Sequence, residues 1–184
     1  MQKAFVFSGF GGQGVMFAGQ LLAYAAMDVG LHVTWIPSYG PEMRGGTAHC
    51  FVNISDKPIG SPVVSNPDIG LVFNLPSFDK YEPIIAADGL LVANQSLIPD
   101  AVTTRDDITL LSIPATDMAY EMGNAKLTNI ILMGAMLATT SVLSVDALHD
   151  ALDNHIPESK RKLLPINHQA LDKGANFVSN PQFA

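Results

Sequence analysis

Three glycines near the amino terminus have the spacing of a phosphate-binding loop. Gly9, Gly11 and Gly14 fit the pattern G-x-G-x-x-G, directly after an apolar run and directly before a stretch typical of a helix. With Gly12 and Gln13 they would leave backbone N–H groups at the amino end of that helix, where its dipole favours an anion. We therefore predict an anion site in this loop.

The glycine loop also allows two alternative interpretations. Binding of NAD or FAD by a stand-alone oxidoreductase calls for an acidic residue ~20 residues past the motif, at the end of the second strand. That strand instead ends at Pro37 and Ser38, and Glu42 lies beyond it in a loop, which disfavours a dinucleotide. In the second interpretation the glycines serve a tight turn and close packing alone, in a purely structural interaction subunit.

The second candidate site is the stretch PSYGPEMRGGTAHC, residues 37–50. It brings Tyr39, Glu42 and Arg44 together before Gly45, in a chain with only 15% charged residues. The guanidinium of Arg44 is planar and always charged, and such a group suits a carboxylate or a phosphate. The alternative is a solvated loop whose charges face water.

The remaining reactive side chains predict no catalytic residue and no metal site in this chain. The single cysteine, Cys50, cannot alone hold zinc or an iron–sulfur cluster, and we expect it to pack as a small apolar residue within a strand. The five histidines are scattered along the sequence, so we interpret them as surface or structural residues. They are His32, His49, His149, His155 and His168.

Composition excludes several classes of partner. The 184 residues carry 10 Lys and Arg against 17 Asp and Glu, a net charge of -7, which repels nucleic acid and anionic membranes. A hydrophobic content of 48% supports a proper core in one domain. We find no signal peptide or membrane-spanning run and expect a cytoplasmic protein.

The apolar patterns predict alternating strands and helices, followed by a helical carboxyl-terminal region. The predicted strands cover residues 3–8, 32–38, 47–55, 68–74, 89–95 and 108–115. The predicted helices cover residues 15–30, 77–86, 127–140, 145–156 (capped by Ser144) and 159–178 (interrupted or kinked at Pro165). Residues 1–38 and 68–95 are each predicted to form a β-α-β unit.

These elements predict an α/β fold: a doubly wound, Rossmann-like, mostly parallel sheet with helices on both faces. In such a sheet the glycine loop and the 37–50 loop would both follow the carboxyl ends of strands. They would then converge on one edge, the usual position of a ligand crevice.

Four motifs, in order, resemble a known family. GFGGQGV, PSYGPEMRGGTAHC, SDKPIGSPVVSNPD (55–68) and GLLVANQSLI (89–98) are similar to the gamma subunit of 2-oxoacid:ferredoxin or other acceptor oxidoreductases. That family includes enzymes for 2-oxoglutarate, branched-chain 2-oxoacids and pyruvate. The resemblance covers nearly the whole chain and implies one gamma-type domain, residues 1–184.

The resemblance also implies a function shared with other chains. The complex would oxidatively decarboxylate a 2-oxoacid, with 2-oxoglutarate favoured here, form its acyl-CoA and pass electrons to ferredoxin or another acceptor. Thiamine diphosphate and iron–sulfur clusters would reside on alpha and beta subunits, with a ferredoxin-like delta subunit as a further candidate partner. This chain would bind no cofactor firmly, would serve assembly and coenzyme A access, and would be inactive alone.

Overall fold

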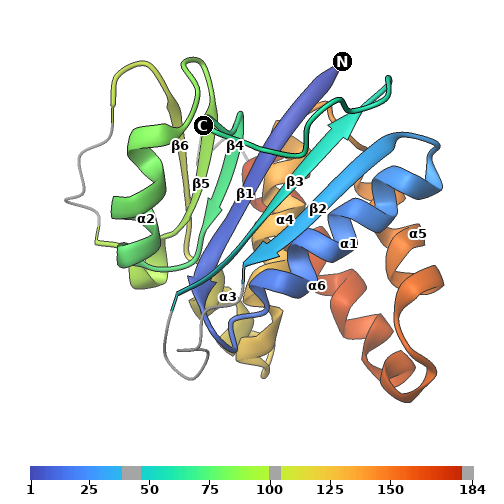
Figure 1. Cartoon of the computed structure of the whole chain (residues 1–184). Coiled ribbons are helices and arrows are strands. Elements are labelled where there is room, and N and C mark those ends of the chain that lie inside the picture. Colours follow the sequence, from blue (N-terminus) through green and yellow to red (C-terminus); the bar gives the residue numbers. More distant parts are fainter. Residues whose placement is uncertain (39–46, 100–104, 180–184) are drawn as a thin grey trace.

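A computed structural model of the chain describes residues 1–38, 47–99 and 105–179. In it, six strands rich in apolar residues form one mixed sheet. The strand order is β2-β3-β1-β4-β5-β6 (Figure 1). The strands are β1 (Gln2–Phe10), β2 (His32–Ser38), β3 (Thr47–Ser55), β4 (Ile69–Val72), β5 (Leu90–Asn94) and β6 (Thr109–Ile113). All six predicted strands are present.

The helices fall on both faces of this sheet, as predicted. They are α1 (Val15–Asp28), α2 (Leu75–Tyr81), α3 (Ala115–Glu121), α4 (Thr128–Thr139), α5 (Val145–His155) and α6 (Leu164–Ser179). Buried residues of α1, α3, α4, α5 and α6 share the larger core, whereas α2 packs a smaller core on the opposite face. Figure 1 shows α2 at the left, apart from α1, α5 and α6.

The central strand β1 contributes to both cores. Phe5 and Phe7 point into the larger core and Val6 into the smaller one, and all three are fully buried. This alternation follows from the two-residue period of a strand covered on both faces.

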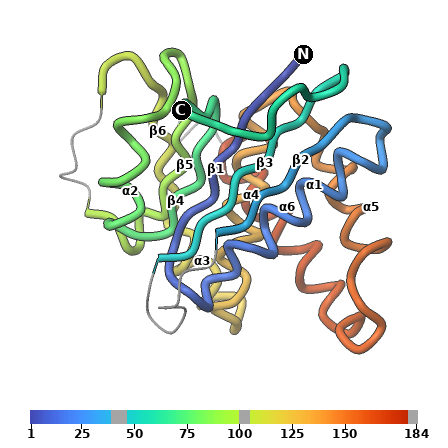
Figure 2. The backbone as a smooth tube through the Cα atoms, in the orientation of Figure 1, coloured from blue at the N-terminus to red at the C-terminus, as the bar shows by residue number. Residues whose placement is uncertain are grey.

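The first predicted β-α-β unit, β1-α1-β2, is present, but β3 lies between its two strands and runs antiparallel to both. The smooth trace in Figure 2 shows β3 in this position. The pairs β1–β4, β4–β5 and β5–β6 are parallel, so the sheet is still mostly parallel. The second predicted unit, β4-α2-β5, is confirmed.

Local side chains explain where several helices begin. The Ser144 hydroxyl accepts the Ala147 N–H at 3.1 Å and caps α5, as predicted. Asn74 caps α2 by accepting the Ser77 N–H at 3.0 Å. Pro165 is the second residue of α6, after a 3-10 helix over Glu158–Leu163, so it lies in the first turn rather than kinking a longer helix. The short helix α3 was not predicted.

Two glycines let α4 and α6 pack backbone against backbone. A Cβ built on Gly134 would overlap the carbonyl oxygen of Leu171, and one on Gly174 would overlap the carbonyl oxygen of Ile131. A larger residue at either position would therefore push the helices apart.

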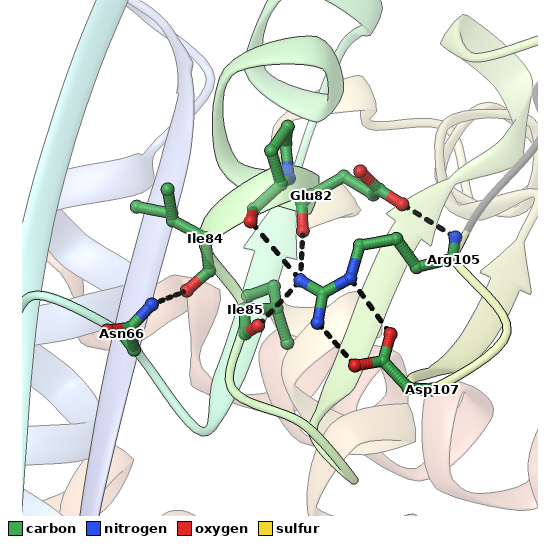
Figure 3. A network of polar contacts seen from close by, with 7 residues as sticks. Asn66, Glu82, Ile84, Ile85, Arg105 and Asp107 are labelled. Carbon is green, nitrogen blue, oxygen red and sulfur yellow. Dashed lines mark hydrogen bonds and ion pairs between the residues drawn. The ribbon is translucent and has the colours of Figure 1, made fainter.

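A polar network closes the amino edge of the parallel strands (Figure 3). The Arg105 guanidinium donates to both carboxylate oxygens of Asp107, at 2.9 and 2.7 Å, and to the carbonyls of Glu82, Pro83 and Ile85. Asn66 donates to the nearby Ile84 carbonyl. This arginine is satisfied by the fold and lies at the edge opposite the glycine loop.

Among the residues that the structure describes, no helix is both long and apolar enough to cross a lipid bilayer.

Candidate functional site

The glycine loop joins β1 to α1 in a conformation that needs glycine. Gly12 and Gly14 have φ values of 98° and 78°, in the left-handed region, and Gly14 is the N-cap of α1. A Cβ on Gly9 would lie 2.6 Å from Gln13 Oε1 and 2.9 Å from Phe73 Cβ. The prediction that this loop caps the first helix is confirmed.

Amide side chains hold the loop in place. Oε1 of Gln13 accepts the Phe10 N–H at 2.6 Å and the Asn74 side-chain amide at 3.0 Å. From the other side, Asn129 on α4 donates its side-chain amide to the Gly14 carbonyl at 3.2 Å. The loop is thus tied to the starts of both α2 and α4.

Two backbone N–H groups of this loop have no acceptor among the described residues. The Gln13 N–H is used inside the turn, because it donates to the Phe10 carbonyl at 3.2 Å. Within the described residues, the N–H groups of Gly11 and Gly12 have no acceptor, and no side chain caps the first turn of α1. Together with the helix dipole, these groups favour an anion.

The second predicted motif is described only at its ends. Tyr39, Glu42, Arg44 and Gly45 lie outside the described residues. The strand register pairs Ser38 with His49 across β2 and β3, and Phe10 with Thr47 across β1 and β3. Residues 38 and 47 therefore sit at the same sheet edge as the start of the glycine loop.

A cavity of about 520 Å³ opens beside the glycine loop. Gly12, Gly14 and one side of α1 form one wall, and the segment before α4, the end of α5 and the start of α6 form the others. Its polar lining includes Gln20, Asn124, Asn129 and Asn167. Its apolar lining includes Phe17, Leu21, Leu127, Ile156 and Leu163.

Two lysines give this cavity its charge. Lys126 and Lys160 line it, and among the described residues neither ammonium group has an acidic partner within 4 Å. The cavity's imidazole, His155, is instead paired with Asp28 at 2.9 Å and stacks on Tyr24 with ring centroids 4.1 Å apart. Both lysines are exposed, so they give this side of the cavity positive charge in a chain of net charge -7.

Sequence reasoning missed four contributors to this site. Asn74 was detectable, since an Asn between a buried strand and a short helix is a typical N-cap. Asn129, Lys126 and Lys160 carried no local signal. Asn129 reaches the glycine loop, and the two lysines reach the cavity beside it, only through tertiary packing.

Cys50 and His49 have shifted pKa values that fit structural roles. Cys50 is fully buried, and burial raises the pKa of its thiol to about 12. The expectation of a small apolar residue within a strand is confirmed. Burial, helped by nearby Lys80, lowers the pKa of His49 below its usual value.

The histidines are less scattered in space than in sequence. His149, His155 and His168 each bond a carboxylate, and His149 and His168 lie side by side across α5 and α6. Helix packing brings together two histidines that lie 19 positions apart in the sequence.

Comparison with known proteins identifies the family. The chain matches the pyruvate ferredoxin/flavodoxin oxidoreductase family over residues 4–177. It is 37% identical to the 2-oxoglutarate synthase subunit KorC of Methanothermobacter marburgensis, over 99% of this chain and 100% of that one. It is 34% identical to the ketoisovalerate oxidoreductase subunit VorA of the same organism, over 93% of this chain, and spans only 35% of VorA's length.

Solved structures agree with these matches. The gamma subunit of a keto/oxoacid ferredoxin oxidoreductase from Geobacter sulfurreducens superposes with a TM-score of 0.81 at 28% identity, over 96% of this chain and 98% of that one. A 2-oxoglutarate:ferredoxin oxidoreductase from Magnetococcus marinus shares the fold, with a TM-score of 0.88 at 21% identity, over 100% of this chain and 32% of its own. The resemblance found in the four motifs is confirmed, and the chain belongs to the pyruvate ferredoxin/flavodoxin oxidoreductase family.

Proposed function

We propose that this chain, as one domain of residues 1–184, is the gamma-type subunit of a complex that oxidatively decarboxylates a 2-oxoacid to its acyl-CoA. The match to KorC over that protein's full length supports 2-oxoglutarate as the substrate. Electrons would pass to ferredoxin or another acceptor, and the complex would work in the cytoplasm.

The chain's single cysteine does not fit the iron–sulfur chemistry of such a complex. That cysteine is buried with a raised pKa, which opposes a thiolate ligand for an iron–sulfur cluster. When bound, thiamine diphosphate supplies the decarboxylation chemistry and the clusters carry the electrons. We assign both to alpha and beta subunits, with a ferredoxin-like delta subunit as a further partner.

We propose that coenzyme A binds in the cavity beside the glycine loop, which Lys126 and Lys160 line. Coenzyme A combines several phosphates with an adenine and a long, mostly apolar arm. Lys126 and Lys160 supply positive charge for phosphates, and the Gly12 N–H, which has no acceptor among the described residues, supplies a donor. Phe17, Leu163 and the other apolar residues supply walls for the rest.

The proposed role of the chain is to bind and orient coenzyme A for attack on an acyl group held elsewhere in the complex. Arg44 and its neighbours Tyr39, Glu42 and Gly45 are proposed to complete the site, because residues 38 and 47 lie at the same sheet edge as the glycine loop.

The test is coenzyme A kinetics in the assembled complex. Lys126→Ala, Lys160→Ala and Arg44→Ala should each raise the apparent KM for coenzyme A about tenfold or more, since a charge-assisted contact contributes roughly 1.5–3 kcal/mol. Lys162→Ala is the matched control, because Lys162 lies in the same 3-10 helix as Lys160 but not in the cavity lining.

Size-exclusion chromatography separates a ligand role from an assembly role. An intact complex in which all three variants keep the wild-type KM would rule out the coenzyme A site. Loss of assembly in every variant would instead favour a purely structural subunit.

A further inference from the structure

A chain of four hydrogen-bonded side chains links α5 to α6, on elements that Figure 1 shows side by side. His149 and Asp153 lie four residues apart on α5, and His168 and Asp172 lie four apart on α6. His149 Nε2 bonds Asp172 at 2.9 Å and His168 Nε2 bonds Asp153 at 3.0 Å. The two Nδ1 atoms face each other at 2.6 Å.

The carboxylates decide which ring nitrogens carry hydrogen. An ionised carboxylate only accepts, so both Nε2 atoms must donate, and a neutral imidazole then has no hydrogen left for Nδ1. Two lone pairs would thus face each other at hydrogen-bond distance, which is repulsive. A cation between them, either a proton or a metal ion, removes the repulsion.

We propose that His149 and His168 form a binding site for a divalent late first-row metal ion, with Zn²⁺ as the best fit. Imidazole nitrogen is a preferred zinc ligand. Metal-binding histidines almost always donate their other N–H to a carboxylate, a backbone carbonyl or water, and both rings face a carboxylate here. The two aspartates orient the rings, and the two Nδ1 atoms bind the ion.

Charge favours a divalent ion over a proton. The two aspartates form no ion pair with Lys or Arg among the described residues. With both carboxylates ionised and both imidazoles neutral, the four side chains carry a charge of -2, which one divalent ion neutralises and one proton does not.

Metal binding requires both a small separation of the two rings and a tilt of each ring, so that both Nδ1 lone pairs point at one ion. Zinc–nitrogen bonds of about 2.0–2.1 Å at a tetrahedral angle place two ligand nitrogens about 3.3 Å apart, so the rings must separate by about 0.7 Å. Both rings are partly exposed, at 22% and 26% of their side-chain surface, which gives room and solvent access.

This site has two protein ligands rather than a closed shell. Within the described ranges, no group of three or more His, Cys, Asp and Glu side chains is placed to hold one ion. Water would complete the coordination, and the affinity should be weaker than that of a four-ligand structural site. A bound ion would tie together α5 and α6, which form part of the cavity wall.

The test is titration of the purified full-length chain with ZnCl₂ alone by isothermal calorimetry, and with Co²⁺ by visible absorption. The wild type should bind one ion per chain. His149→Gln and His168→Gln should each weaken binding at least tenfold, and Asp153→Asn and Asp172→Asn about 10- to 100-fold. Binding should also weaken as pH falls, because protons compete for the same lone pairs.

His155→Gln is the matched control, since His155 also pairs with a carboxylate but stacks on Tyr24 instead of a second imidazole. It should leave the zinc affinity within about twofold, and circular dichroism melts would confirm that each variant folds. The proposal is overturned if the double variant His149→Gln/His168→Gln binds zinc as tightly as the wild type. Nitrogen NMR showing a shared Nδ1 proton that zinc does not displace would also overturn it.

Discussion

Replacing Gly134 with alanine sets two opposing effects against each other. In an exposed helix, Gly→Ala stabilises by about 1 kcal/mol through helix propensity. Here, however, the new Cβ would overlap the Leu171 carbonyl oxygen and lie 3.1 Å from the Ala175 nitrogen, so α4 and α6 must move apart. Overpacking costs about 1–3 kcal/mol, and we take the upper end because the obstacle is backbone. The net expectation is a loss of about 2 kcal/mol.

Urea denaturation of the purified chain measures this loss. Gly174→Ala should behave alike, since its Cβ would overlap the Ile131 carbonyl oxygen. The double variant should lose less free energy of unfolding than the sum of the two single variants, because helices separated by one methyl group already accommodate the other. Gly60→Ala is the control, with no atom within 4 Å of its Cβ, and should change stability by less than about 0.5 kcal/mol. A Gly134→Ala protein as stable as the wild type would refute the packing argument.

Four further outcomes are expected. Ser144→Ala should destabilise the chain by about 1 kcal/mol in urea denaturation, because it removes the N-cap of α5, and Ser144→Asp should restore most of that loss. Cys50 should resist iodoacetamide at pH 8 until the chain unfolds, because burial raises its pKa to about 12; rapid labelling of the folded chain would contradict this. Because the pKa of Cys50 is raised in the folded chain, its contribution to the free energy of unfolding is fully present below the usual thiol pKa and is lost as pH rises toward 12. Cys50→Ser should lessen this decline in the free energy of unfolding. Asn129→Ala should raise the KM for coenzyme A in the assembled complex, because it removes the hydrogen bond that holds the glycine loop. An unchanged KM would show that Asn129 has no part in coenzyme A binding.

Elements with a local signal were predictable from the sequence. The glycine loop, the six strands and the Ser144 cap each depend on residues within a few positions of one another, such as Ser144 and Ala147. The predicted bounds of β2 and β3 match the structure, because Pro and Gly residues lie at both ends of the stretch between the two strands.

Strand order and the cavity were not predictable in this way. The alternating pattern of β3 says which face is buried but not that the strand enters between β1 and β2. Asn129 bonds the Gly14 carbonyl across 115 residues, and His149 meets His168 only because α5 and α6 pack together. Such contacts follow from tertiary packing, which the periodicity of apolar residues along the chain does not predict.

The position of β3 also bears on the order in which the protein can fold during synthesis. Both neighbours of β1 come from later in the chain: β3 pairs Ser55 with Gln2, and β4 pairs Ile69 with Phe5. A ribosome that has released only β1, α1 and β2 has therefore released a strand with two bare edges, and sequence-distant pairing of this kind is slow. Until β4 has emerged, the apolar strand β1 is therefore a target for chaperones and for aggregation.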